Sequence, residues 1–183
     1  MIGGHRPEVL GAPRIVQEGG RSHVRFDGKA DGWVVPNNPL TGWPSFTVEM
    51  LFRPAGEGEF EQKVVHVEDT AGRRLMFETR LEGARWSLDT FLTTGASSGM
   101  LLDRALSHPA GQWHWAAVVY DHGRMTSFVN GRQELSTTVD FTPMVSGRTG
   151  LGVRLNRVFW YGGDIGELRF HPRPLPADEL ARA

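Results

Sequence analysis

Polar side chains occur at alternate positions in four segments of the chain that otherwise have the pattern of β-strands. Because successive side chains of a strand point to opposite faces, the polar residues of each segment share one face. They are His66 in VVHVE, Glu78 and Arg80 in MFETR, Asp89 in SLDTF, and Arg154 and Asn156 in VRLN. If the four strands belong to one sheet, these six side chains form a single polar patch.

The residue types in this patch are suited to a polyhydroxylated or acidic ligand. Carboxylate and amide groups exchange hydrogen bonds with sugar hydroxyls, and an arginine fork binds a carboxylate or a sulfate through two bonds at once. The alternative interpretation is a solvated outer face with scattered ion pairs, which is the default for one side of an antiparallel sheet. The combination of a histidine, an amide and two arginines favours a binding site.

Aromatic side chains are the second ingredient of sugar recognition, because the apolar C–H face of a pyranose can lie against a ring. Four aromatic residues lie beside turns: Trp33, Trp43, Trp160 and Tyr161. Trp160 follows closely on Arg154, so we expect it to border one end of the patch, although packing in the core is the alternative for any single ring. The predicted ligand-binding residues are therefore His66, Glu78, Arg80, Asp89, Arg154, Asn156 and Trp160.

The strands that would position these residues are clearest in residues 111–132, which read GQWHWAAVVYDHGRMTSFVNGR. Two apolar strings, 113–120 and 125–129, have the residue types and the two-residue period of strands. Asp121 and Gly123 in the break between them allow a tight reversal, and Asn130-Gly131 is a strong hairpin signal. The segment therefore predicts one hairpin followed by another, with Trp113, Ala116, Val118 and Phe128 in the core.

Further strands are predicted along most of the chain, and the longest alternating run is 45–53. The others are 23–26, 32–35, 63–67, 74–80, 86–91, 150–156 and 164–170. Helical periodicity occurs only at the end, where we expect a short helix from Pro176 to Arg182. About ten strands with almost no helix predict an all-β, antiparallel two-sheet jelly-roll sandwich. We expect a single domain over residues 1–183, with its core in about 22–172.

Composition excludes several classes of function. Twenty basic and 21 acidic residues give a formal charge of −1, so nucleic acid is not an expected partner. No stretch approaches the ~20 apolar residues that cross a bilayer, so membrane insertion is not expected. The chain has no cysteine, which excludes disulfides, thiolate chemistry and cysteine-type zinc sites. No signal peptide is visible, and the composition is compatible with secreted and cytoplasmic locations alike.

Three segments resemble successive signatures of the laminin-G-like, concanavalin A-like lectin/glucanase superfamily. They are FDGKADGWVVPNNPLTGWPSFTVEMLFRP, QWHWAAVVYDHGRMTSFVNGR and YGGDIGELRFHPRPLPADEL, in the order and at the spacing of that family. The resemblance implies a jelly roll of two sheets, one of them concave and usually serving to bind glycans or proteins. It does not imply one function, because the fold hosts several.

The resemblance also implies that calcium is a possible cofactor. Asp27, Asp31 and Asp164 are loop-associated carboxylates of the hard-oxygen type that calcium requires. Relatives often have Ile-Asp-Glu where this chain has Ile165-Gly166-Glu167, so one acidic group is missing. We therefore expect no metal at a family-type site and no other cofactor.

Catalytic patterns of the superfamily are only partly present. The Glu-x-Asp-x-Glu run of its glucanases does not occur. Jelly-roll polysaccharide lyases combine arginine, histidine, an amide and a tyrosine, and here His66, Arg80 and Arg154 would be the catalytic candidates. The available tyrosines, Tyr120 and Tyr161, are outside the lyase motif. FDGKADGW is also similar to the opening motif of keto-disaccharide hydrolases.

These observations predict a non-catalytic, lectin-like module whose partner is an oligosaccharide or polysaccharide. The first alternative is a glycan-active enzyme, either a polysaccharide lyase or a glycoside or keto-glycoside hydrolase, that uses the polar patch. The second alternative is a protein-interaction domain. The sequence pattern does not identify the sugar or the oligomeric state.

Overall fold

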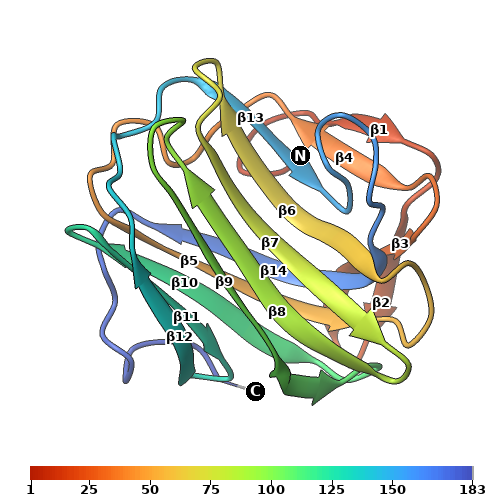
Figure 1. Ribbon diagram of the computed structural model, residues 1–183. Helices are drawn as coiled ribbons and strands as arrows, with labels where there is room; N and C mark the ends of the chain where they lie inside the picture. The colour runs from red at the N-terminus through yellow and green to blue at the C-terminus, as the bar shows by residue number, and fades with distance from the viewer. Residues whose placement is uncertain (183) are drawn as a thin grey trace.

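The computed structural model describes residues 1–182, which form two seven-stranded antiparallel sheets packed face to face (Figure 1). The first sheet has the order β1 (Glu8–Leu10), β4 (Gly32–Val35), β13 (Gly147–Leu151), β6 (Glu61–Asp69), β7 (Arg74–Glu82), β8 (Arg85–Thr93) and β9 (Ser98–Pro109). The second has the order β12 (Arg132–Thr138), β11 (Arg124–Val129), β10 (His114–Asp121), β5 (Phe46–Pro54), β14 (Gly162–His171), β3 (Arg21–Asp27) and β2 (Arg14–Glu18). The predicted all-β jelly-roll class is confirmed, and within residues 1–182 no helix could span a membrane.

The core lies between the two sheets and follows the alternation of their strands. On β5, Phe46, Val48, Met50 and Phe52 are all fully buried, as the sequence pattern predicts. The Phe52 ring meets Trp86 of the opposite sheet edge-on, with 4.8 Å between ring centroids. Contacts of this kind bury both rings and join the sheets, since apolar area removed from water is the main stabilising contribution.

The predicted double hairpin is present in β10, β11 and β12. Asp121 pairs with Arg124, and the two turn residues between them, His122 and Gly123, both have positive φ (41° and 91°). Positive φ at both positions is the requirement of the turn that matches strand twist. Asn130 and Gly131 repeat this arrangement at the second reversal, with φ of 50° and 74°.

The predicted core positions of this hairpin divide into two groups. Ala116 and Val118 lie in the core between the sheets, as expected. Trp113 is only partly buried, because it precedes β10 and lies against the Arg53 guanidinium at 4.7 Å. Phe128 is buried in a separate apolar cluster with residues of the C-terminal segment.

The prediction of a helix from Pro176 to Arg182 is wrong. The segment makes a turn, with one backbone hydrogen bond from Glu179 N to Pro176 O, and its backbone then bonds the sheet through Ala181 N and Glu49 Oε1. Leu175 and Leu180 are buried in the same cluster as Phe128. Contacts of Leu180 and of the Ala181 backbone with the second sheet decide the path of this segment and override its weak helical pattern.

Two other differences from the predicted strands concern edges and a loop. The sequence pattern misses β1, β2 and β9, which lie at sheet edges where one face or both are exposed and alternation is weak. The predicted strand 150–156 ends at Leu151. Gly152 there has φ of 75°, and a β-carbon on it would lie 2.5 Å from the Phe26 ring, so the chain turns out of the sheet at this point.

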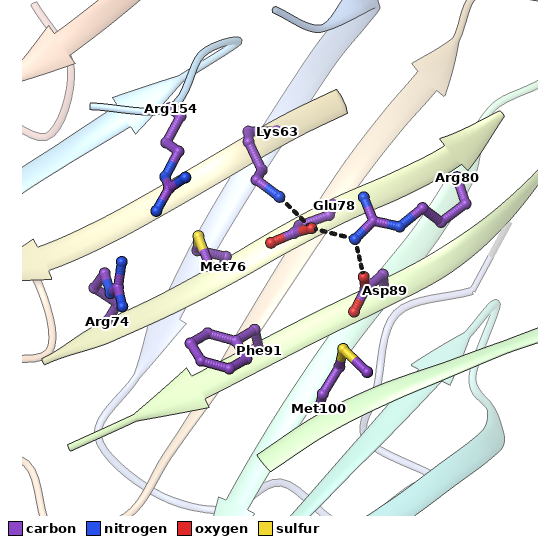
Figure 2. A pocket seen from close by; sticks show the side chains of 9 residues that line it. All are labelled: Lys63, Arg74, Met76, Glu78, Arg80, Asp89, Phe91, Met100 and Arg154. Atoms are coloured by element: carbon purple, nitrogen blue, oxygen red, sulfur yellow. Dashed lines mark hydrogen bonds and ion pairs between the residues drawn. The ribbon is translucent and has the colours of Figure 1, made fainter. Parts of the chain in front are cut away.

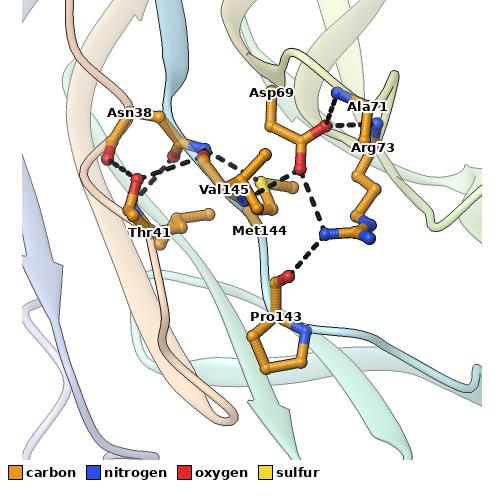
Figure 3. A network of polar contacts seen from close by, with 9 residues as sticks. Asn38, Thr41, Asp69, Ala71, Arg73, Pro143, Met144 and Val145 are labelled. Atoms are coloured by element: carbon orange, nitrogen blue, oxygen red, sulfur yellow. Dashed lines mark hydrogen bonds and ion pairs between the residues drawn. The ribbon is translucent and has the colours of Figure 1, made fainter.

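A buried carboxylate fixes the loop that leads into β13 (Figure 3). Asp69 accepts hydrogen bonds from the backbone of Ala71 and Arg73 at 2.9 Å each and from Val145 N at 2.9 Å. Asn38 Nδ2 donates to Val145 O at 2.9 Å from the other side. These bonds hold the loop between the β6–β7 turn and the segment after β4, so they fix the start of β13 beside β6.

Replacement of Leu180 by Ala should lower the free energy of unfolding by about 2–4 kcal/mol, because it opens a cavity in the cluster with Phe128. Ile15→Ala, at an exposed position of β2, is the control and should change stability by less than about 0.5 kcal/mol. Urea denaturation measures both. A Leu180→Ala effect as small as the control would mean that the tail does not pack on the sheet.

Candidate functional site

A pocket of about 200 Å³ lies on the outer face of the first sheet, over β6, β7, β8 and β9 (Figure 2). Its lining residues are Lys63, Arg74, Met76, Glu78, Arg80, Asp89, Phe91, Met100 and Arg154. Four of the predicted site residues, Glu78, Arg80, Asp89 and Arg154, are among them. The alternation argument brought Glu78, Arg80 and Asp89 to one face correctly, whereas Arg154 lies beyond the end of β13 and reaches the pocket from a loop.

Lys63 is in the pocket because β6 is irregular at this point. Strict alternation would place Lys63 on the same face as Val65 and Val67, which are core residues. A register shift between Lys63 and Val65 inserts Val64 as an extra core residue, so that Lys63 pairs with Glu78 while Val65 pairs with Phe77. Such a bulge redirects one side chain to the other face of the sheet.

The centre of the pocket is a chain of buried charges from three strands. Arg80 Nη2 donates to Glu78 Oε2 at 2.9 Å and to Asp89 Oδ2 at 2.5 Å, which links carboxylates that are cross-strand neighbours. Lys63 Nζ forms ion pairs with Glu78 and, at 2.5 Å, with Glu61 Oε1. Lys63, Glu78 and Asp89 are 3% exposed or less, so each charge depends on these partners for compensation.

Asp89 is the carboxyl group whose ionisation this arrangement disfavours most clearly. Burial first, and then the neighbouring Glu78 carboxylate, raise the pKa of Asp89 to about 6, while Arg80 acts in the opposite direction. Its Oδ1 atom is buried without a hydrogen-bond partner among the described residues. Near pH 6 this atom can accept a hydrogen bond or, when the acid is protonated, donate one.

His66 lies beside the pocket but does not line it. The residue is 1% exposed, its Nδ1 accepts a hydrogen bond from Leu155 N at 3.1 Å, and its Nε2 lies 3.2 Å from Glu68 outside hydrogen-bond geometry. Burial, and then the positive charges of Arg154 and Arg74, lower the pKa of His66 to about 3. A neutral imidazole that is covered by a loop supports the backbone rather than reaching a ligand.

The open side of the pocket combines arginines with apolar side chains. Arg74 and Arg154 are partly exposed and extend toward Met76 from opposite sides (Figure 2). Phe91 and Met100 form an apolar edge, and Met100 is 60% exposed. A flat apolar edge beside hydrogen-bonding groups is the arrangement that suits a sugar ring.

Besides His66, two predicted site residues lie outside the pocket lining. Asn156 is exposed in the turn that follows Arg154, and Trp160 lies near Gly32 of β4, where a β-carbon on that glycine would be 3.4 Å from the Trp160 ring. Both positions follow from the end of β13 at Leu151, since alternation no longer holds after it.

Sequence reasoning missed five residues that line the pocket: Lys63, Arg74, Met76, Phe91 and Met100. Arg74, Met76 and Phe91 stand at even spacing from Glu78 or Asp89 on their own strands, so alternation could have identified them. Lys63 and Met100 had no such signal.

The tyrosines of the lyase hypothesis are not near this pocket. Tyr161 is fully buried in the core, and burial raises its pKa well above the ordinary value. Tyr120 is 3% exposed and its hydroxyl donates to Val139 O at 3.0 Å. The pocket as described therefore lacks a tyrosine that could move protons.

The carboxylates that the family would use for calcium are engaged by other groups. Asp27 Oδ1 accepts three backbone hydrogen bonds within its own turn, and Asp31 accepts bonds from two further backbone amides. Asp164 is bound by Arg25 and Arg53, each at 2.8 Å. No group of three or more histidine, aspartate or glutamate side chains in residues 1–182 is arranged to hold a metal ion.

The position of Gly166, where the family resemblance implies an acidic group, is closely packed. It lies at a bulge of β14 between Ile165 and Glu167. A β-carbon at this position would lie 3.2 Å from the Trp113 ring and 3.3 Å from Leu51. A side chain would therefore require Trp113, which contacts Arg53, or Leu51 to move by a few tenths of an ångström.

A second hollow, of about 340 Å³, lies between the sheets near the N-terminus. Its wall is mainly apolar and includes Trp33, Leu151, Ile165 and Phe170. It offers few of the hydrogen-bonding groups that a polyhydroxylated ligand needs. The pocket over β6–β9 is therefore the candidate site.

The chain matches the profile of the concanavalin A-like lectin/glucanases superfamily over residues 27–181. It therefore belongs to this superfamily. No curated protein matches the sequence.

Solved structures share the fold at low sequence identity. Domain 4 of AbnA, an extracellular arabinanase from Geobacillus stearothermophilus solved with arabinotriose, has a TM-score of 0.68 and 17% identity, over 92% of this chain and 79% of that one. The binding domain of botulinum neurotoxin DC, solved in complex with SialylT, has 0.66 and 10%, over 96% of this chain but only 44% of its own length. A SAP-like pentraxin from Limulus polyphemus has 0.62 and 13%, over 85% and 77%.

Lys63→Met should lower the free energy of unfolding by about 3 kcal/mol, because it leaves the buried Glu78 carboxylate with Arg80 as its only cationic partner. Adding Glu78→Gln in the same chain should recover part of this loss. Lys29→Met, at the exposed second lysine, is the matched control and should have almost no effect. Equal denaturation midpoints for Lys63→Met and Lys29→Met would contradict a stabilising ion pair between Lys63 and Glu78.

His66 should make the free energy of unfolding depend on pH, and its substitution should remove this dependence. The unfolded state binds a proton near pH 6.5 and the folded state only near pH 3, so the contribution is present above pH 6.5 and is lost as the pH falls. Relative to His66→Gln, the wild type should lose about 2 kcal/mol between pH 7 and pH 5. Asp89 acts in the opposite sense over this window, which is why the difference between the chains is the quantity to measure. Stability profiles of the wild type and His66→Gln that run parallel between pH 7 and pH 5 would contradict the low pKa of His66.

Proposed function

We propose that this protein is a glycan-binding module whose ligand lies in the pocket over β6–β9. The observation that carries the proposal is the coincidence, on one outer sheet face, of buried charged groups with an apolar edge formed by Phe91 and Met100. Sugars present both hydroxyl groups and apolar C–H faces, so a site for them needs both kinds of surface.

Free hydrogen-bonding capacity in the pocket supports this proposal. Arg74 Nε, Arg80 Nη1 and Asp89 Oδ1 are buried polar atoms without a hydrogen-bond partner among residues 1–182, and of these Arg80 Nη1 has an ion-pair contact with Glu61 Oε2 at 3.4 Å. Buried polar groups are normally satisfied, so an unsatisfied group that faces a pocket is a candidate to bond a ligand or water. The two donors and one acceptor match the mixed donor and acceptor character of sugar hydroxyls.

Two of the proteins that share this fold were solved with sugar-type ligands, arabinotriose in one and SialylT in the other. At 17% and 10% identity these similarities show the fold. They support a glycan as the ligand of this chain but do not identify the sugar. The proposal for this chain therefore rests on its own pocket.

A hydrolase is the second candidate function, favoured by one observation. Glu78 and Asp89 are bridged by a single Arg80 nitrogen, and the pKa of Asp89 is raised to about 6, mainly by burial. In glycosidases a carboxyl group with a raised pKa acts as the acid beside a second carboxyl group, which is the nucleophile or base. Both are almost fully buried, which favours the binding function over this one.

Phe91→Ala should weaken binding of the recognised oligosaccharide about three- to ten-fold without unfolding the chain, because it removes the apolar surface under the ring. The ligand is first selected on an array of neutral and acidic oligosaccharides, and affinity is then measured by calorimetry. Ile15→Ala, on the other sheet, is the control. An assay for new reducing ends and unsaturated products runs in parallel.

Unchanged affinity of Phe91→Ala, or the absence of any bound glycan on the array, would overturn the proposal. Release of products that stops in Glu78→Gln would establish the hydrolase instead.

A further inference from the structure

Two cations of the pocket have no acidic partner within residues 1–182. Lys63 and Arg80 are bound to carboxylates, whereas no ion pair in this part of the chain includes Arg74 or Arg154. The Nε atom of Arg74 is in addition buried without a hydrogen-bond partner. Positive charge is therefore left over at one end of the pocket, while the opposite end is neutralised.

The two arginines converge on the same space. Arg74 comes from the start of β7 and Arg154 from the segment after β13, and both guanidinium groups lie around Met76 (Figure 2). Arg74 also lies 5.9 Å from the centre of the Phe91 ring, so the cationic end adjoins the apolar edge. Paired guanidinium groups favour an anion that accepts several hydrogen bonds, such as a carboxylate or a sulfate.

The low pKa of His66 agrees with positive charge at this end of the pocket. After burial, Arg154 and Arg74 are the largest causes of the low pKa of His66, followed by Lys63 and Arg148. Of the nearby carboxylates, Glu61 and Glu78 pair with Lys63 and Arg80, whereas Glu68 lies 3.2 Å from His66 Nε2 and opposite Arg74 on the neighbouring strand. A site with this field attracts anions and is sensitive to salt.

The backbone around Arg154 is held against β6 and so fixes the base of its side chain. Gly152 N donates to Val64 O at 2.9 Å, and Leu155 N donates to His66 Nδ1 at 3.1 Å. Arg157 N closes a turn by donating to Arg154 O at 2.8 Å. A residue anchored on both sides loses less conformational freedom when it binds a ligand.

We infer that the ligand of this pocket is an anionic glycan, with a carboxylate or sulfate group held between Arg74 and Arg154 and an adjoining sugar ring over Phe91 and Met100. The inference rests on the proposed glycan-binding function and specifies the chemical class of its ligand. Neutral glycans lack the group that would use the two free guanidinium groups.

The test compares ligands that differ only in the anionic group. Tetragalacturonate and its fully methyl-esterified form are one pair, and a sulfated carrageenan tetrasaccharide and its desulfated form are the other. Calorimetry with the full chain should give at least about ten-fold tighter binding of the anionic member of one pair. The pair that shows the preference identifies the group as a carboxylate or a sulfate, and added salt should reduce the preference.

Arg154→Gln and Arg74→Gln should each remove most of this preference by weakening the anionic ligand alone. Arg124→Gln removes the same charge from an exposed position on the second sheet and should leave the preference intact. Because Arg74 and Arg154 are partly exposed, all three variants should keep the wild-type unfolding midpoint within a few degrees.

The outcomes separate this inference from the proposed function. Equal binding of anionic and neutral members, with affinity still reduced in Phe91→Ala, would overturn the anionic specificity and leave glycan binding in place. A preference that persists in both pocket arginine variants would also overturn it. Failure of every glycan to bind would overturn the proposed function and this inference together.

Discussion

Desolvation of charged side chains on the outer face of the first sheet is the constraint on which the candidate site depends. Lys63, Glu78 and Asp89 are almost inaccessible to water, although they point away from the hydrophobic core. Removal of one partner from such a set leaves an uncompensated charge, which is strongly destabilising. The network therefore forms the frame of the pocket, and recognition falls to the less buried side chains around it.

A bulge in the backbone of β6 explains why Lys63, a buried charge of the frame, lies on the outer face of the sheet. At the bulge of β6, Val64 and Val65 both contribute to the core, so Lys63 and His66 both turn outward although they are three positions apart. Without this extra residue, strict alternation would place a lysine among core side chains. The irregularity thus satisfies the core and supplies the cation that Glu78 requires.

Sequence periodicity predicted the parts of the fold and site in which that periodicity is maintained. It placed the core face of β5, the β10–β11 hairpin, and Glu78, Arg80 and Asp89 correctly, because neighbouring strands with regular pairing determine which side chains meet. It failed for Lys63 at the bulge and for Asn156 beyond β13. The C-terminal segment was also misjudged, because contacts with strands far away in the sequence decide its path, and a local pattern contains no information about them.

Irregular backbone at the bulge of β6 and in the loop after β13 places two cations of the pocket, Lys63 and Arg154. Arg154 reaches the pocket because the chain leaves β13 at Gly152, passes through positive φ at Arg157 (63°) and Phe159 (57°), and is bonded back to β6 by Lys63 N and Phe159 O at 2.9 Å. Non-glycine residues with positive φ store strain, which the surrounding contacts must offset. The features that distinguish this pocket are therefore the bulge and this loop, both departures from the regular sandwich. Similarity of the sandwich at 10–17% identity shows the fold alone, so the specificity of this chain has to be argued from its own side chains.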